Sequence, residues 1–186
     1  MITKPILLVE DEENDVLFFQ RAMSKAGMTN LLQVARDGQE AIGYLKGMGK
    51  FALRAEFPLP DLILLDLKLP FVMGLDVLKW IRQQSGLAPI VIILSSSQEE
   101  ADIASAYRLG ANAYLVKPPD PARLGDMVRA INDFWLTQNM PPPNSPPNRA
   151  LETVENPRAL GLAVHGCTLA INSQASLPSG IPRSGL

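Results

Sequence analysis

The sequence predicts an α/β fold: a doubly wound, five-stranded parallel sheet with helices on both faces. Five short apolar runs, at 6–9, 31–35, 62–65, 90–94 and 113–116, alternate with stretches of helical periodicity. The runs at 62–65 and 90–94 are apolar at every position, which is typical of strands buried on both faces. Because parallel strands need crossover connections, the helices between them cover the two faces of the sheet.

The stretches between these runs carry apolar residues at the spacing of amphipathic helices. The predicted helices span 14–26, 40–45, 75–84, 97–109 and 122–136. Asn14 is expected to cap the first helix, and Ser97 with Glu100 has the pattern of a capping box for the fourth. The glycines and prolines at 47–60 predict a longer loop that carries no chemistry.

The composition changes after residue 139. Residues 1–139 hold all predicted strands and helices, and half of the chain's 16 prolines lie in residues 140–186. Clustered prolines cannot hydrogen-bond as a helix or a central strand, so we expect a disordered, proline-rich tail. This tail is too short and irregular to predict a DNA-binding domain.

Charge and composition exclude several classes of function. The net charge is −2 without a basic block, so nucleic acid is not expected as a direct partner. The apolar runs fall far below the roughly 20 residues that span a bilayer. The single cysteine, Cys167, excludes an internal disulfide, and the single histidine, His165, argues against histidine-rich metal sites and a Ser-His-Asp triad. We therefore expect a soluble cytoplasmic protein without membrane contact.

Polar residues follow four of the predicted strands at the point where each strand ends. Glu10 and Asp11 follow the first strand, Asp66 the third, Ser95 the fourth and Lys117 the fifth. The carboxyl ends of parallel strands meet at one edge of the sheet, where ligands bind in open α/β folds. We therefore expect these side chains to form one site.

This set of residues suits a metal ion and a phosphoryl group. Three carboxylates in one pocket repel one another unless a cation joins them, and Mg²⁺ is the hard ion that prefers such oxygen ligands. Lys117 adds a second positive charge, and Ser95 adds a hydroxyl donor, although Ser96 is the alternative. Asp66 is the candidate nucleophile, and an aspartyl phosphate is a known type of covalent intermediate.

The strand-end motifs resemble those of the response-regulator receiver domain of two-component signalling. They are Leu-Val-Glu-Asp at 8–11, Leu-Asp-Leu-Lys-Leu-Pro at 65–70 with Gly74, Leu-Ser at 94–95 and Lys-Pro at 117–118. The resemblance covers 4–138 and implies a flavodoxin-like sheet with strand order 2-1-3-4-5.

The resemblance also implies roles for the residues at the sheet edge. Asp66 would accept a phosphoryl group from a sensor histidine kinase, and Lys117 would contact that group. Mg²⁺ would lie among Glu10, Asp11, Asp66 and the backbone carbonyl of Lys68.

A switch is implied by the same resemblance. Ser95 would be the switch hydroxyl, and Tyr114 would rotate with it, which changes a surface made by the fourth helix, the fifth strand and the last helix. The resemblance further implies a cis peptide bond between Lys117 and Pro118, which the small trans preference of X-Pro bonds permits.

The Phe-Trp-Leu ending of the last helix and the lack of a predicted output domain resemble stand-alone regulators paired with bacterial phytochromes. The partner would then be a phytochrome-type sensor kinase. Phe134 and Trp135 are adjacent on a helix and cannot both face the sheet, so one is expected at the surface. It would belong to a homodimer interface made by the last helix and the fifth strand.

Two positions depart from the usual pattern of receiver domains. Met73 stands where receivers often carry a polar residue, and the side chain of Lys68 is expected to change the lifetime of the phosphorylated state.

Two rival functions remain. One rival is a binding module with this fold that works without phosphate. The other is a phosphatase with an aspartate nucleophile, but Lys68 occupies the position where such enzymes need a second acid.

Overall fold

The computed structural model describes residues 4–84 and 88–140. The predicted tail is 140–186, and its residues 141–186, with His165 and Cys167, lie outside the described residues. Within the described part of the chain, none of the helices has the length and apolar character needed to cross a membrane.

The five predicted strands form one parallel sheet. They are β1 (Ile6–Val9), β2 (Leu32–Ala35), β3 (Leu62–Leu65), β4 (Ile90–Ser95) and β5 (Ala113–Val116). Their order in the sheet is β2-β1-β3-β4-β5, and every neighbouring pair is parallel. The predicted sheet and strand order are confirmed.

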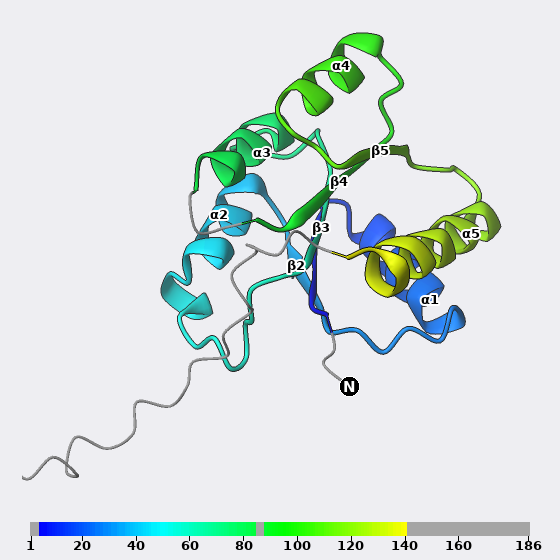
Figure 1. The fold of residues 1–186 in the computed structure, drawn as a ribbon, viewed down its shortest axis with the longest axis horizontal. Coiled ribbons are helices and arrows are strands. Elements are labelled where there is room, and N and C mark those ends of the chain that lie inside the picture. Colours follow the sequence, from blue (N-terminus) through cyan, green and yellow to red (C-terminus); the bar gives the residue numbers. More distant parts are fainter. Residues whose placement is uncertain (1–3, 85–87, 141–186) are drawn as a thin grey trace, which may run out of the picture. The chain divides into compact units, whose positions relative to one another are not determined.

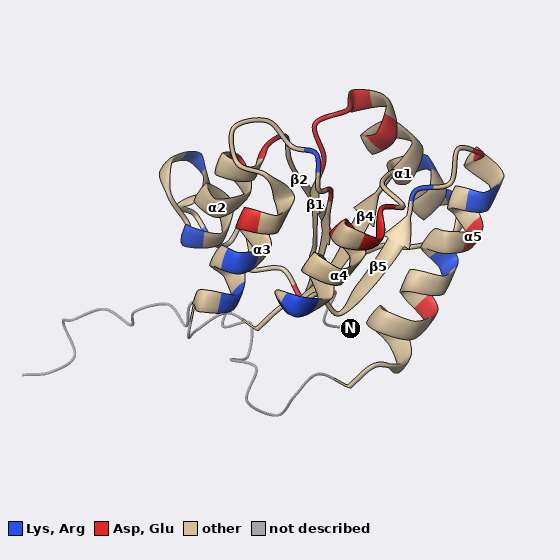
Figure 2. Cartoon of the chain, turned by 90° about the horizontal axis from the view of Figure 1, so that it is seen from above, with Lys and Arg blue, Asp and Glu red and all other residues tan. Residues whose placement is uncertain are grey.

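Helices cover both faces of this sheet (Figure 1). They are α1 (Glu13–Lys25), α2 (Gly38–Lys46), α3 (Gly74–Gln83), α4 (Glu100–Arg108) and α5 (Pro121–Ile131). Helices α1 and α5 pack together on one face, and α2 contacts α3, which contacts α4, on the other. Acidic and basic residues alternate along the outer side of α5 (Figure 2).

Alternate residues of each central strand enter two separate apolar clusters. Leu7 and Val9 of β1 pack under α2 and α3, whereas Ile6 and Leu8 pack under α1 and α5. All four are buried, and each buried side chain of this size contributes roughly 1.5–3 kcal/mol. Burial on both faces is the reason that the central strands are apolar at every position.

Three expectations about helix ends are wrong. Helix α1 begins at Glu13, so Asn14 lies inside its first turn. Helix α4 begins at Glu100 without a side-chain cap, because the Ser97 hydroxyl donates to the carboxylate of Asp102 at 2.6 Å instead. The last helix does not run regularly to residue 136: α5 ends at Ile131, and a wider π-helix continues over Asn132–Gln138. There the Thr137 hydroxyl bonds to the Asn132 carbonyl.

The loop after α2 is held by Arg54. Its guanidinium donates to the carbonyls of Tyr44 and Leu45, each at 2.8 Å, and to the carbonyl of Phe57 at 3.2 Å. The rings of Tyr44, Phe51 and Phe57 meet edge to face beside it. Arg54 thereby satisfies carbonyls that the end of α2 leaves without helical partners.

We predict that Arg54→Ala lowers the free energy of unfolding by about 1.5–3 kcal/mol, because buried carbonyls lose a charged donor. Urea denaturation followed by circular dichroism measures this value. Arg21→Ala, which truncates an exposed arginine of α1, is the control and should change stability little. Equal stability of the two variants would contradict the role given to Arg54.

Candidate functional site

The sheet register brings the predicted site residues to one edge. Val9 pairs with Leu65 and Ser95 with Val116, so the residues that follow these strands emerge together. Backbone bonds extend the ladder by one step, since the N–H of Asp66 donates to the Val9 carbonyl and that of Lys117 to the Ser95 carbonyl.

Three carboxylates gather at this edge. Glu10, Asp11 and Asp66 each offer an oxygen, and these oxygens lie within 4.8 Å of one another. Glu10 is 2% and Asp66 7% exposed, whereas Asp11 is exposed. A hard divalent ion such as Mg²⁺ prefers such a set of oxygens and keeps waters at its open positions, so the donor set fits this ion.

Asp66 is oriented by its own backbone. Its Oδ1 accepts from the N–H of Leu67 at 2.6 Å and of Lys68 at 3.3 Å. Gly74 permits this turn, because a Cβ there would lie 2.0 Å from the Asp66 carbonyl oxygen. The second carboxylate oxygen, Oδ2, is left to face Lys117.

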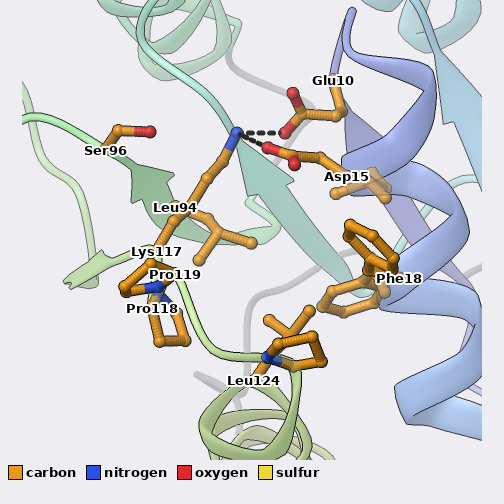
Figure 3. Close-up of a pocket in the computed structure, with 12 residues that line it drawn as sticks. Glu10, Asp15, Phe18, Leu94, Ser96, Lys117, Pro118, Pro119 and Leu124 are labelled. Atoms are coloured by element: carbon orange, nitrogen blue, oxygen red, sulfur yellow. Dashed lines mark hydrogen bonds and ion pairs between the residues drawn. The ribbon is translucent and has the colours of Figure 1, made fainter.

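The ammonium of Lys117 contacts three carboxylates. Its Nζ lies 2.5 Å from Glu10 Oε2, 2.8 Å from Asp66 Oδ2 and 2.9 Å from Asp15 Oδ2. Figure 3 shows the contacts with Glu10 and Asp15, which approach from the β1–α1 side. An ammonium has three N–H donors, so each carboxylate accepts one.

Burial and neighbouring charge shift the pKa values of Glu10 and Lys117 in opposite directions. Burial raises the pKa of Glu10 to about 7, although the hydrogen bond from Lys117 opposes this. Burial lowers the pKa of Lys117, but its hydrogen bonds with Asp66, Glu10 and Asp15 together raise it above the ordinary value. Lys117 therefore stays an ammonium and offsets the charge of the buried acids.

Asp15 is a site residue that the sequence interpretation missed. It lies in the first turn of α1, whereas the prediction considered residues that directly follow strands. No local pattern marks it, because its partner Lys117 lies 102 residues further along the chain.

The predicted switch residues lie beside the acidic group. Ser95 is fully buried, and its Oγ accepts weakly from the N–H of Ser97 at 3.4 Å. Ser96, the alternative, is exposed and lines the pocket next to Lys117 (Figure 3). The Tyr114 hydroxyl donates to the Ser97 carbonyl at 3.0 Å, and partial burial raises the pKa of Tyr114.

The expected cis bond between Lys117 and Pro118 is wrong. The described residues contain no cis peptide bond. The trans form suffices here, because the side chain of Lys117 reaches Glu10 and Asp66 from it, and the trans isomer is intrinsically the more stable one.

A pocket of about 270 Å³ adjoins Lys117 between α1 and the connection from β5 to α5. Its charged end is formed by Glu10, Asp15 and Lys117. Phe18 and Leu124 close its apolar end, as Figure 3 shows. Lys117 is thus reached from solvent on this side.

The connection from β3 to α3 places an aromatic ring at the surface. Phe71 is 84% exposed and has a φ of +63°, in the left-handed region that non-glycine residues rarely adopt. This connection packs against Gly38, where a Cβ would lie 2.1 Å from the Val72 carbonyl oxygen.

The family model of the response regulator receiver domain matches residues 6–129. This stretch contains all five strands and the three clustered carboxylates. The chain belongs to the response regulator receiver domain family. The resemblance seen in its strand-end motifs is confirmed.

Individual relatives of this receiver domain are response regulators. The chain is 38% identical over 134 residues to response regulator Rcp1 of Synechocystis sp., a match that covers 72% of this chain and 89% of Rcp1. The phosphorylated cyanobacterial phytochrome response regulator RcpA has a TM-score of 0.70 and 37% identity over 75% of this chain and 99% of RcpA. The Mn²⁺-bound form of Rcp1 has a TM-score of 0.67 and 36% identity, with the same coverage. The protein is therefore a receiver-domain response regulator related to phytochrome response regulators.

Receiver domains are signalling domains that bind Mg²⁺ at an acidic site. The group formed by Glu10, Asp11 and Asp66 has the composition of such a site in this receiver domain.

Proposed function

We propose that this protein is a cytoplasmic, single-domain response regulator that accepts a phosphoryl group on Asp66 from a sensor histidine kinase. The observation that carries this proposal is the placement of Lys117 Nζ 2.8 Å from Asp66 Oδ2, beside carboxylates that suit a divalent ion. The match over 89% of Rcp1 and 99% of RcpA supports a stand-alone regulator.

The carboxylate of Asp66 is arranged for attack on phosphorus. Two backbone N–H groups hold Oδ1, so Oδ2 on the lysine side is the oxygen directed at an incoming phosphoryl group. A P–O bond to Asp66 forms while the P–N bond of the phosphohistidine breaks. The electron pair of that bond returns to the imidazole, which takes up a proton.

Positive charge at the site lowers the barrier to this transfer. Lys117 pairs with a phosphoryl oxygen at the edge of the pocket. Mg²⁺, held by Glu10, Asp11, Asp66 and the backbone carbonyl of Lys68, would neutralise phosphoryl charge.

The switch function rests on Ser95 and Tyr114. The buried Ser95 hydroxyl donates to a phosphoryl oxygen, and its displacement changes the loop that carries the Ser97 carbonyl. Tyr114 is bonded to that carbonyl and follows it. A surface formed by α4, β5 and α5 then has two states, and phosphorylation favours one of them.

We expect wild-type protein to be labelled by acetyl phosphate or by its kinase in the presence of Mg²⁺, and Asp66→Asn to take up no label. Labelling is scored by intact-protein mass spectrometry, with chelation of Mg²⁺ as a second test. Asp76→Asn, which removes an exposed carboxylate of α3, is the matched control and should be labelled normally. An unlabelled wild type would instead favour a binding module that works without phosphate.

Lys68 lies two residues after the acceptor, and its exposed side chain borders the approach of an attacking water. We predict that Lys68→Asn changes the first-order dephosphorylation rate severalfold. The decay of the phosphorylated form after removal of donor measures this rate. Lys79→Asn removes an exposed lysine of α3 and should leave the rate unchanged, and equal rates in wild type and Lys68→Asn would remove the hypothesis.

A phytochrome-type kinase is the partner that the relatives favour. RcpA carries phytochrome in its name and is 37% identical to this chain. Phosphotransfer from a panel of sensor kinases would identify the donor by its rate.

A homodimer through β5 and the last helix, taken as α5 with its π-helical continuation, is the proposed assembly. Phe134 is 51% exposed and stacks edge to face on Trp135, which is partly buried against the core. The apolar ring at the end of the last helix is available for a second copy of the chain.

We predict that Phe134→Ser weakens dimerisation by at least about tenfold, since an exposed aromatic contributes the most at an interface. Analytical ultracentrifugation measures the dimer dissociation constant. Phe71→Ser removes an exposed ring from a different element, the connection from β3 to α3, and is the matched control. A monomeric wild type, or equal effects of both changes, would contradict the proposed interface.

A further inference from the structure

The three carboxylates on Lys117 come from different kinds of element. Glu10 and Asp66 follow strands and are buried, whereas Asp15 lies in the first turn of α1 and is 42% exposed. Each accepts a hydrogen bond from the ammonium, at distances of 2.5 to 2.9 Å. Asp15 therefore holds the lysine from the solvent side of the site.

These carboxylates differ in what the proposed reaction does to them. Glu10 and Asp66 belong to the group whose oxygens could ligate a metal ion, so a bound ion competes with Lys117 for both. Phosphoryl transfer then converts the Asp66 carboxylate into an acyl phosphate, which lacks the carboxylate charge. Asp15 is outside the metal-binding group, and neither event takes its oxygens from the lysine.

The side chain of Lys117 needs a partner that stays in place throughout the reaction if its ammonium is to keep one position. Lysine carries its charge on a flexible four-carbon stem, so an ammonium without a fixed partner samples many positions. The pocket beside Lys117 provides the space for this movement. Asp15 lines that pocket from the first turn of α1, and the N-terminal end of a helix also favours a negative charge (Figure 3).

We propose that Asp15 is a positioning residue that keeps the ammonium of Lys117 beside Asp66 while the metal ion and the phosphoryl group occupy the site. This inference deepens the proposed phosphoacceptor function and rests on it. Asp15 acts through Lys117 and takes no part in bond formation.

The first test compares variants in the phosphorylation of Asp66 by acetyl phosphate at saturating Mg²⁺. Asp15→Ala should lower the maximal rate about tenfold, as expected when a catalytic group loses its orientation, and leave the half-saturating donor concentration nearly unchanged. Asp15→Glu should restore part of the rate, because it keeps the charge. Asp15→Asn, which keeps an oxygen acceptor and the shape of the side chain, should lie between wild type and Asp15→Ala.

Glu13→Gln is the matched control, because it removes the same charge from an exposed position in the same helical turn. Its maximal rate should equal that of wild type. A loss in Glu13→Gln as large as that in Asp15→Ala would show a general charge effect and overturn the proposal, as would an unchanged rate in Asp15→Ala.

A second readout follows the ammonium itself and needs no phosphorylation. The side-chain ¹⁵N NMR signal of Lys117 should persist in wild type when Mg²⁺ alone is added, and should broaden beyond detection in Asp15→Ala. Persistence in both proteins would overturn the inference. If wild type binds no phosphoryl group at all, the proposed function fails, while the NMR comparison still decides the role of Asp15.

Discussion

The ion pairing around Lys117 is the interaction on which the functional edge of the sheet depends. Glu10 and Asp66 are almost fully buried, and an uncompensated buried carboxylate is strongly unfavourable. One ammonium within 2.9 Å of three carboxylates offsets this cost and fixes the ends of three strands relative to α1. Breaking such a pair by removing one partner typically costs about 3–5 kcal/mol. The edge that holds the proposed phosphoacceptor is therefore also a part of the molecule where electrostatic interactions contribute strongly to stability.

Ser97 joins the buried serine to two surface elements. Its N–H faces Ser95 Oγ, its carbonyl accepts from Tyr114 on β5, and its own hydroxyl donates to Asp102 on α4. A single residue thus carries bonds to β4, β5 and α4. Contiguous hydrogen bonds thus connect Ser95 with both outer elements, and in the proposed switch they would carry a displacement from Ser95 to that surface.

The strands and the site residues at their ends were predictable, because burial on both faces leaves a continuous apolar run that ends where the polar residue begins. Features that depend on tertiary contacts were not predictable from the sequence. Ser97 has the pattern of a helix cap, yet its hydroxyl bonds to Asp102, which no local rule indicates. Asp15 was missed because only the tertiary ion pair with Lys117, 102 residues away in the sequence, brings it to the site. Likewise, the wider turns after Ile131 have no marker such as proline.

Phe71 occupies a backbone position where its side chain lowers the stability of the domain. A left-handed backbone costs a side chain with a Cβ roughly 1–2 kcal/mol, and a ring that is 84% exposed recovers almost none of this through burial. Glycine or asparagine would adopt the same backbone at lower cost. The isolated domain consequently has a lower melting temperature than the same fold would have with glycine or asparagine at this position, in the connection directly after β3.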